Sequence, residues 1–306
     1  MQKLRDSSNI VRFANHIKEL EKRSRELADK LYMFISEPKQ TLLITYHRQG
    51  YLPASIAYWF IATMEPTLYT ILHESNTLAY YVVPYREGGK ILFYSTNPYS
   101  ASTLNILQVA NLTGKEILLF TMKPRDERIE AIYSRYRRLY VDIEDELKAS
   151  LVMAIASYYA FAKYYRKELG RRGARLYKHS VEGLAPIIEE LVNKYVEQLE
   201  KIVKNKEVIV TSSKLLEPVA LYFAEALKRI GVDASYQHYE YLSKDIPVIF
   251  LTTSVEEYFT REILFKFNLM RIKSENIVLN TDPLEAQIYF ALLAYYIMFS
   301  GEYDTR

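Results

Sequence analysis

The sequence predicts an α/β protein made of two similar units in tandem, each with a mainly parallel sheet that carries helices on both faces. The chain has 306 residues, about twice the length of a typical domain. Short β-prone runs alternate with helical stretches, an order typical of parallel sheets. This alternation starts again after the break "GRRGAR" at 170–175. We therefore expect domains at 1–170 and 171–306.

The first unit opens with a long amphipathic helix over residues 8–35. Apolar residues such as Phe13, Ile17 and Leu20 recur there at helical spacing among charged residues. The pattern then predicts strands at 41–46, 67–72, 90–95, 115–121 and 138–142, with helices at 53–64, 75–81, 100–113 and 143–169. Gly170 follows as a helix C-cap, so 170–175 is expected to be a linker.

The second unit repeats this organisation behind a second long helix. The pattern predicts that leading helix at 176–204, strands at 207–211, 233–238, 247–252 and 276–280, and helices at 215–230, 255–270 and 284–300. Strands that alternate with helices in this way again indicate a parallel sheet with helices on both faces.

The composition excludes several classes of protein and site. Because the chain has no cysteine and only five scattered histidines, we expect no disulfide, no metal site and no cofactor. No apolar run reaches the ~20 residues of a membrane helix, and the N-terminus lacks the apolar region of a secretion signal. We expect a soluble, cytoplasmic protein, and the abundance of Tyr, Lys and Glu is typical of a thermophile.

A stretch rich in hydroxyl groups, "YSTNPYSAST" at 94–103, joins a predicted strand to a predicted helix. The loop between a parallel strand and the next helix presents free backbone N–H groups and the positive end of the helix dipole, and it therefore suits anions such as phosphate. The candidate ligands for a phosphate are Ser95, Thr96, Asn97, Ser100 and Thr103. An N-cap with ordinary surface polarity would explain the same residues.

This stretch resembles the phosphate loop of the SIS (sugar isomerase) family, S-x-S-G-x-T-x-x-T-L. In "STNPYSASTL", Ser95 and Thr103 match the pattern and Ser100 replaces a threonine. Asn97 and Pro98 stand where the family has serine and glycine. The arrangement of two such units resembles the isomerase half of glucosamine-6-phosphate synthase. The resemblance implies two SIS-type three-layer αβα units, a sugar phosphate ligand and a homodimer.

The resemblance also implies further ligand-binding residues in both units. His47 and Arg48 follow the first predicted strand, where the family has its first ligand loop. Ser212 and Ser213 stand in the corresponding loop of the second unit, in place of the family's glycines.

If the resemblance extends to chemistry, the reaction is aldose–ketose isomerisation of a hexose or hexosamine 6-phosphate. This reaction moves a proton between neighbouring carbons and requires a carboxylate base. Glu144 and Glu146 both stand where the resembled enzyme has its base, although acidic residues in a first helical turn also favour the helix dipole. His238 and Glu240 are the nearest substitutes for the family's ring-opening histidine. No glutaminase domain with a cysteine nucleophile is expected, so only the sugar half of the synthase reaction is considered.

Two other functions stay open. One alternative is a non-catalytic phosphosugar-binding or regulatory protein with an altered site. Arginines interleaved with tyrosines at 134–140 and 164–179 would instead suit nucleic acid, but a solvated basic surface explains them equally well, and the net charge of +3 is small. Nucleic acid is therefore not the expected partner.

Overall fold

The computed structural model describes residues 2–37, 40–168, 170–242 and 245–302. Its contacts divide into two compact units. Residues 20–183 form the N-terminal unit, and residues 1–19 together with 184–306 form the C-terminal unit. The sequence-based division after residue 170 assigns the helix over residues 171–182 to the C-terminal unit, whereas the contacts assign it to the N-terminal unit.

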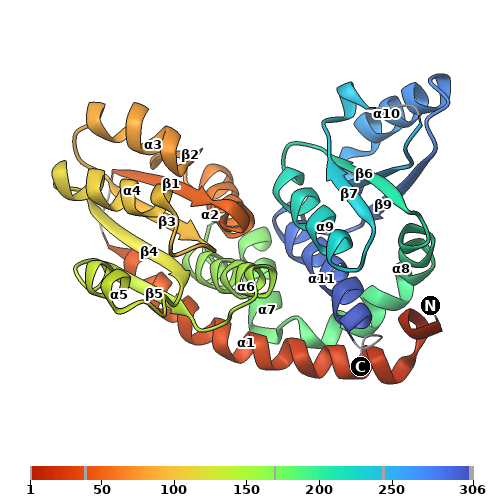
Figure 1. The fold of residues 1–306 in the computed structure, drawn as a ribbon, viewed down its shortest axis with the longest axis horizontal. Helices are drawn as coiled ribbons and strands as arrows, with labels where there is room; N and C mark the ends of the chain where they lie inside the picture. The colour runs from red at the N-terminus through yellow and green to blue at the C-terminus, as the bar shows by residue number, and fades with distance from the viewer. Residues whose placement is uncertain (1, 38–39, 169, 243–244, 303–306) are drawn as a thin grey trace. The chain divides into compact units, whose positions relative to one another are not determined.

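The N-terminal unit contains a five-stranded sheet in the order β2-β1-β3-β4-β5 (Figure 1). Every pair of neighbouring strands is parallel. The strands are β1 (Thr41–His47), β2 (Tyr69–Glu74), β3 (Lys90–Ser95), β4 (Glu116–Met122) and β5 (Arg137–Val141). Each has a buried or half-buried apolar run, as strands covered on both faces should.

Helices cover both faces of this sheet. The core on one face joins α3 (Ser75–Tyr81), α4 (Ala101–Leu112) and α5 (Glu127–Tyr133) to the strands through residues such as Leu78, Ile106 and Phe93. The other face is covered by α2 (Tyr51–Met64) and α6 (Glu146–Tyr164), which pack on each other. On that face, the hydroxyl groups of Tyr94 in β3 and Ser157 in α6 lie 2.8 Å apart.

The C-terminal unit contains a four-stranded sheet in the order β7-β6-β8-β9, again parallel throughout. Its strands are β6 (Glu207–Ser212), β7 (Asp233–Tyr236), β8 (Val248–Thr253) and β9 (Ser274–Leu279). Its helices are α8 (Ile188–Val203), α9 (Glu217–Arg229), α10 (Glu257–Leu269) and α11 (Pro283–Glu302). Ile263 and Phe267 of α10 pack on Phe250 on one face, and α9, α8 and α11 pack together on the other side. The predicted fold class is confirmed.

The first part of α1 (Ser7–Ser36) belongs to the C-terminal unit because it packs on α11. The Phe13 ring lies edge-on to Tyr296, with centroids 5.0 Å apart. The Asn9 side-chain amide donates to the Ser300 hydroxyl over 2.8 Å. Residues 20–36 of the same helix belong to the N-terminal unit.

The structure corrects the sequence prediction around residues 170–204. The expected linker is helical: α7 (Arg171–Glu182) starts directly after Gly170, and a Cβ atom on Gly173 would lie 2.1 Å from the Glu168 carbonyl oxygen. Glycine thus lets this turn approach the preceding segment closely. The helix expected over 176–204 is interrupted at Gly183, whose φ is 90°, and α8 begins after it. Residue 169, the expected end of the preceding helix, lies outside the described residues.

Two long apolar helices, α6 and α11, are internal. Their side chains are almost all buried, from Leu147 to Ala162 in α6 and from Ala286 to Phe299 in α11, with Lys148 and Tyr289 half-buried. Within the described ranges, every helix is too short or too polar to cross a lipid bilayer. Packing against the sheets therefore explains their apolar character.

Four charged side chains form a network at the amino ends of β3, β4 and β5. Arg137 donates to both carboxylate oxygens of Glu37, over 2.7 and 2.9 Å, and also binds Glu116. Lys90 lies 2.9 Å from Glu116 and also binds Glu37. Glu37 follows α1 directly, so the network ties the end of that helix to three strands.

We predict that this network makes stability depend on pH. Hydrogen bonds from Arg137 and Lys90 lower the pKa of Glu37 from 4.5 to about 2. Because the folded pKa lies below the unfolded one, Glu37 stabilises the fold above pH 4.5, and this contribution disappears as the pH falls toward 2. Glu37→Gln should therefore lower the melting temperature at neutral pH, and its difference from wild type should shrink on acidification. Glu26→Gln, an exposed change in the preceding helix α1, should show no such difference; equal behaviour of the two variants would refute the prediction.

Candidate functional site

The candidate site lies where the strand order of the N-terminal sheet reverses, between β1 and β3. The chain winds outward from these two strands in opposite directions, and such switch points leave a crevice at the carboxyl ends of the strands. Residues 48–50 follow β1, and residues 96–100 follow β3. These two segments carry most of the sequence-predicted ligands of this unit.

Gly50 allows the turn after β1 to lie directly on β3. A Cβ atom at this position would stand 2.4 Å from the Tyr94 carbonyl oxygen, closer than any side chain can come. The Ser150 hydroxyl of α6 donates to the Gln49 carbonyl oxygen over 2.6 Å. The turn is thus held from two sides, by β3 and by α6.

Arg48 has a left-handed backbone, with φ of 52°. Non-glycine residues adopt this conformation rarely and at an energetic cost, and such residues are concentrated at functional sites. Its guanidinium Nη1 lies 3.0 Å from Oε1 of Glu146, at the start of α6. The Thr96 hydroxyl donates to Oε2 of the same carboxylate over 3.3 Å. The structure therefore brings together three predicted site residues from distant parts of the chain.

The hydroxyl groups of the loop after β3 mainly bond to the loop itself. Ser95 and Thr103 are fully buried, and their hydroxyl oxygens lie 3.0 Å apart and each 3.0 Å from the Asn97 carbonyl oxygen. The Asn97 backbone N–H donates to Ser95 Oγ over 3.2 Å, and the Asn97 side-chain oxygen accepts the Tyr99 N–H. These two hydroxyls therefore set the shape of the loop.

Two serines at the start of α4, Ser100 and Ser102, are half-buried. Ser100 is the N-cap, and its hydroxyl oxygen accepts the Ser102 N–H over 3.1 Å. The Ser102 hydroxyl oxygen accepts the Asn76 side-chain amide over 3.0 Å. Both hydroxyl groups act as acceptors here, which leaves their hydrogens for an anion at the positive end of the helix.

His47, at the end of β1, is half-buried beside Glu74. Burial lowers its pKa below the ordinary 6.5, an effect that the nearby Glu74 carboxylate partly opposes. Nδ1 of His47 lies 3.9 Å from Oε1 of Glu74. A lowered pKa keeps the imidazole neutral at pH 7, so that it can donate or accept a hydrogen bond there.

Glu144, the other candidate base, does not join the cluster. It forms an ion pair with Arg125, and both side chains are mostly exposed. Asp145 lies between the two glutamates and caps α6 by accepting the Lys148 N–H over 2.8 Å.

In the C-terminal unit, the corresponding switch point lies between β6 and β8. The Ser212 hydroxyl donates to the Ser213 carbonyl oxygen over 3.0 Å. The hydroxyls of Ser213 and Thr211 are buried and have no hydrogen-bond partner among the described residues.

His238 and Glu240 form a local turn after β7. The Glu240 N–H donates to Nδ1 of His238 over 3.4 Å, and the two side chains lie 3.7 Å apart with about half of their surface exposed. They belong to the C-terminal unit, whereas Glu146 belongs to the N-terminal unit.

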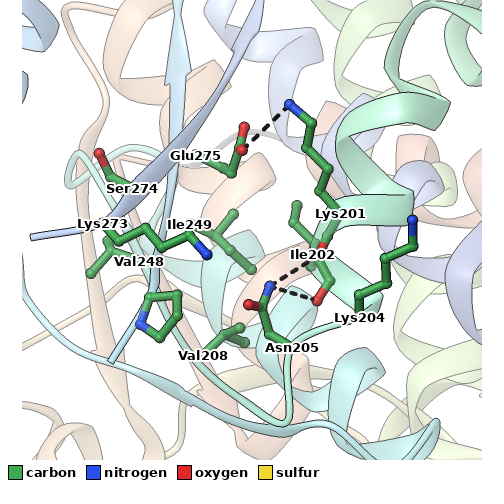
Figure 2. Close-up of a pocket in the computed structure, with 11 residues that line it drawn as sticks. Lys201, Ile202, Lys204, Asn205, Val208, Val248, Ile249, Lys273, Ser274 and Glu275 are labelled. Atoms are coloured by element: carbon green, nitrogen blue, oxygen red, sulfur yellow. Dashed lines mark hydrogen bonds and ion pairs between the residues drawn. The ribbon is translucent and has the colours of Figure 1, made fainter. Parts of the chain in front are cut away.

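A cavity in the C-terminal unit lies at the opposite end of the sheet, by the amino ends of β6, β8 and β9 (Figure 2). Its volume is about 270 Å³. Figure 2 shows Lys201 reaching Glu275, a contact of 3.5 Å, and the Asn205 amide donating to the last carbonyls of α8. Lysines near a helix C-terminus complement its dipole, so helix capping explains this lining.

Sequence reasoning missed Gly50, Ser150 and Asn76, which position the site without being predicted ligands. The glycine directly before a helix, in "HRQGY", was the one local signal available. Ser150 and Asn76 lie far along the chain from their partners and carry no local signal.

No protein-family model and no curated protein sequence matches the chain significantly. Several solved structures do resemble it. The C-terminal domain of glucosamine-fructose-6-phosphate aminotransferase from Francisella tularensis is 12% identical, with a TM-score of 0.59 over 97% of each chain. A provisionally assigned phosphosugar isomerase from Clostridium difficile 630 is 14% identical, with a TM-score of 0.67 over 96% of this chain and 92% of the other. Tagatose-6-phosphate ketose/aldose isomerase from Escherichia coli is 10% identical, with a TM-score of 0.59 over 99% and 93%.

These matches cover nearly the whole of each chain, and identities of this size show the fold alone. The chain has the tandem SIS fold. The resemblance seen in the sequence is therefore confirmed at the level of the fold.

We predict that Arg48→Gly and Arg48→Ala differ in stability. Both remove the contact with Glu146, but only glycine adopts a positive φ without strain. The glycine variant should be more stable by about 1 kcal/mol in urea unfolding, despite the larger flexibility of its unfolded chain. An alanine variant at least as stable as the glycine variant would show that the left-handed backbone at this position carries no strain.

Proposed function

We propose that the N-terminal unit binds a sugar phosphate at the β1–β3 switch point. The observation that carries this proposal is the cluster of Arg48, Thr96 and Glu146 at the carboxyl ends of the two central strands. A cation, a hydroxyl and a carboxylate in one crevice suit a ligand that has both an anion and hydroxyl groups.

The phosphate end of such a ligand would lie between Arg48 and the start of α4. The Arg48 side chain is 54% exposed, and one nitrogen contacts Glu146, so other N–H groups of the guanidinium are available. The hydroxyl hydrogens of Ser100 and Ser102 and the positive end of the α4 dipole add neutral donors.

The sugar end would contact groups that bind hydroxyls. The Asn97 side-chain oxygen is occupied by the Tyr99 N–H, so its amide nitrogen is the group left to donate. The Glu146 carboxylate accepts hydrogen bonds, and the neutral His47 ring can do either. A homodimer, which the SIS resemblance implies, stays a prediction.

Aldose–ketose isomerisation is the second candidate function. Support comes from the contacts of the two candidate bases: the Glu146 carboxylate binds Arg48 and Thr96, whereas Glu144 pairs with Arg125. In this reaction Glu146 would take the proton from the carbon beside the carbonyl group while the carbonyl oxygen gains a proton. The resulting cis-enediol would receive the first proton back at the former carbonyl carbon, as the neighbouring hydroxyl group loses its own proton. If binding occurs without this step, the chain is a non-catalytic phosphosugar-binding protein.

We expect sugar phosphates to raise the melting temperature of the protein. A ligand at roughly 100 times its Kd contributes about 2.7 kcal/mol of stability, a shift of several degrees. Fructose 6-phosphate, glucose 6-phosphate and glucosamine 6-phosphate should be compared with fructose and with inorganic phosphate. Arg48→Gln should abolish the shift, whereas Arg128→Gln, an exposed change in α5, should preserve it. If no sugar phosphate in this panel raises the melting temperature of the wild-type protein, the proposed binding is refuted.

If the protein is an isomerase, Glu146→Gln should lower kcat by about 10²- to 10⁴-fold, because the amide cannot accept the proton. Glu144→Gln changes a carboxylate two residues away that pairs with Arg125, and it should leave kcat unchanged. The measurement is interconversion of fructose 6-phosphate and glucose 6-phosphate, followed by NMR with proton exchange from D₂O. A loss of kcat confined to Glu144→Gln would assign the base to Glu144. If the wild-type protein binds the sugar phosphate but does not convert it, only the binding function is supported.

A further inference from the structure

A second cavity lies in the N-terminal unit, along the outer edge of β5, and has a volume of about 580 Å³. Its lining comes from α1, the segment after β4, α5 and β5, and includes Lys30, Lys123, Glu130, Tyr136, Arg138 and Tyr140. β5 is the last strand of the sheet, and β4 separates it from β3, so this cavity is distinct from the candidate sugar phosphate site.

The cavity is positively charged, with four cations and one carboxylate in its lining. Arg137 is engaged with Glu37 and Glu116, and Arg138 lies 3.6 Å from Glu130. Lys30 and Lys123 are exposed and have no ion-pair partner in the part of the chain that the structure describes. Arg138 also donates to the Ser134 carbonyl oxygen over 3.2 Å and lies over the Tyr140 ring. The two lysines are therefore the cations available to an anionic ligand, and Arg138 adds positive charge beside them.

The two tyrosines present ring carbon, and their hydroxyl groups point inward. The Tyr136 hydroxyl donates to the Leu107 carbonyl oxygen over 3.2 Å, and the Tyr140 hydroxyl oxygen is buried. Both side chains are otherwise half-buried and line the cavity. Their exposed parts therefore contribute aromatic surface beside the cations.

We infer that this cavity binds a nucleoside phosphate, either free or within a single strand of nucleic acid. Cations beside aromatic rings fit a ligand in which phosphates alternate with flat bases. Lys30 and Lys123 contact the phosphates, and Tyr136 and Tyr140 contact a base. An acidic peptide would use the cations but not the rings, and a sugar would find only one acceptor carboxylate, Glu130.

The test is fluorescence anisotropy of a short labelled oligothymidylate with the full chain, at a series of NaCl concentrations. Affinity should fall as salt rises, and Lys30→Gln and Lys123→Gln should each weaken binding and reduce the slope of log K against log [NaCl] by about 1. Tyr136→Leu should weaken binding about tenfold, whereas Tyr136→Phe keeps the ring and should bind as wild type. Thermal unfolding of each variant establishes that it is folded.

Lys22→Gln removes an exposed charge from the same helix outside the cavity and is the matched control. Displacement of the strand by thymidine 5′-monophosphate would support a free nucleotide as ligand, and failure to displace it would support a strand. Three results would overturn the inference: no binding at low salt, an equal loss with Lys22→Gln, or competition by polyglutamate together with no effect of Tyr136→Leu. The last result would assign the cavity to acidic peptides.

Discussion

The backbone of Gly50 lies against the Tyr94 carbonyl group, and the candidate site depends on this contact. Because position 50 has no side chain, the turn after β1 lies directly on the end of β3. Ser150 holds the same turn from α6, the helix that starts with Glu146. The close approach of Gly50 to Tyr94 therefore fixes the position of the turn relative to the central strands and to the Glu146 carboxylate. The left-handed backbone of Arg48 is part of the same turn.

The site differs from a loop that simply displays hydroxyl groups. Ser95 and Thr103 are buried and hold the Asn97 carbonyl, and Glu146 holds both Arg48 and Thr96. The residues available to a ligand are thus a small subset of those that the loop motif suggests. They include one guanidinium, that of Arg48, and one carboxylate, that of Glu146, which the proposed sugar phosphate binding and isomerisation would use.

The fold class could be predicted because strand and helix periodicity are local properties of the sequence. The parallel sheets and the long first helix follow from those patterns. The structure of residues 171–204 could not be predicted in the same way. "GRRGAR" has the composition of a linker, yet α7 begins there because Gly173 permits a close backbone approach to Glu168.

The site was predictable as a region but not in its contacts. The loop after β3 was identifiable, but the choice between Glu144 and Glu146 was not, because both stand near the first turn of one helix. Glu144 precedes the N-cap Asp145, whereas Glu146 is the first residue of α6, and only the tertiary structure shows that Glu146 contacts Arg48 while Glu144 contacts Arg125. The partners of Ser150 and Asn76 are likewise set by the fold.

The closed hydrogen-bond network of the loop after β3 has a consequence for the kinetics of recognition. The Asn97 carbonyl accepts two hydroxyl groups and, more weakly, the Ser100 N–H, so the loop keeps its shape without a bound molecule. A molecule arriving there would meet a rigid surface and would lose little affinity to ordering of the loop. The association rate of that molecule would then be set by diffusion and charge. Its dissociation rate would depend on how strongly Arg48 binds it in place of Glu146.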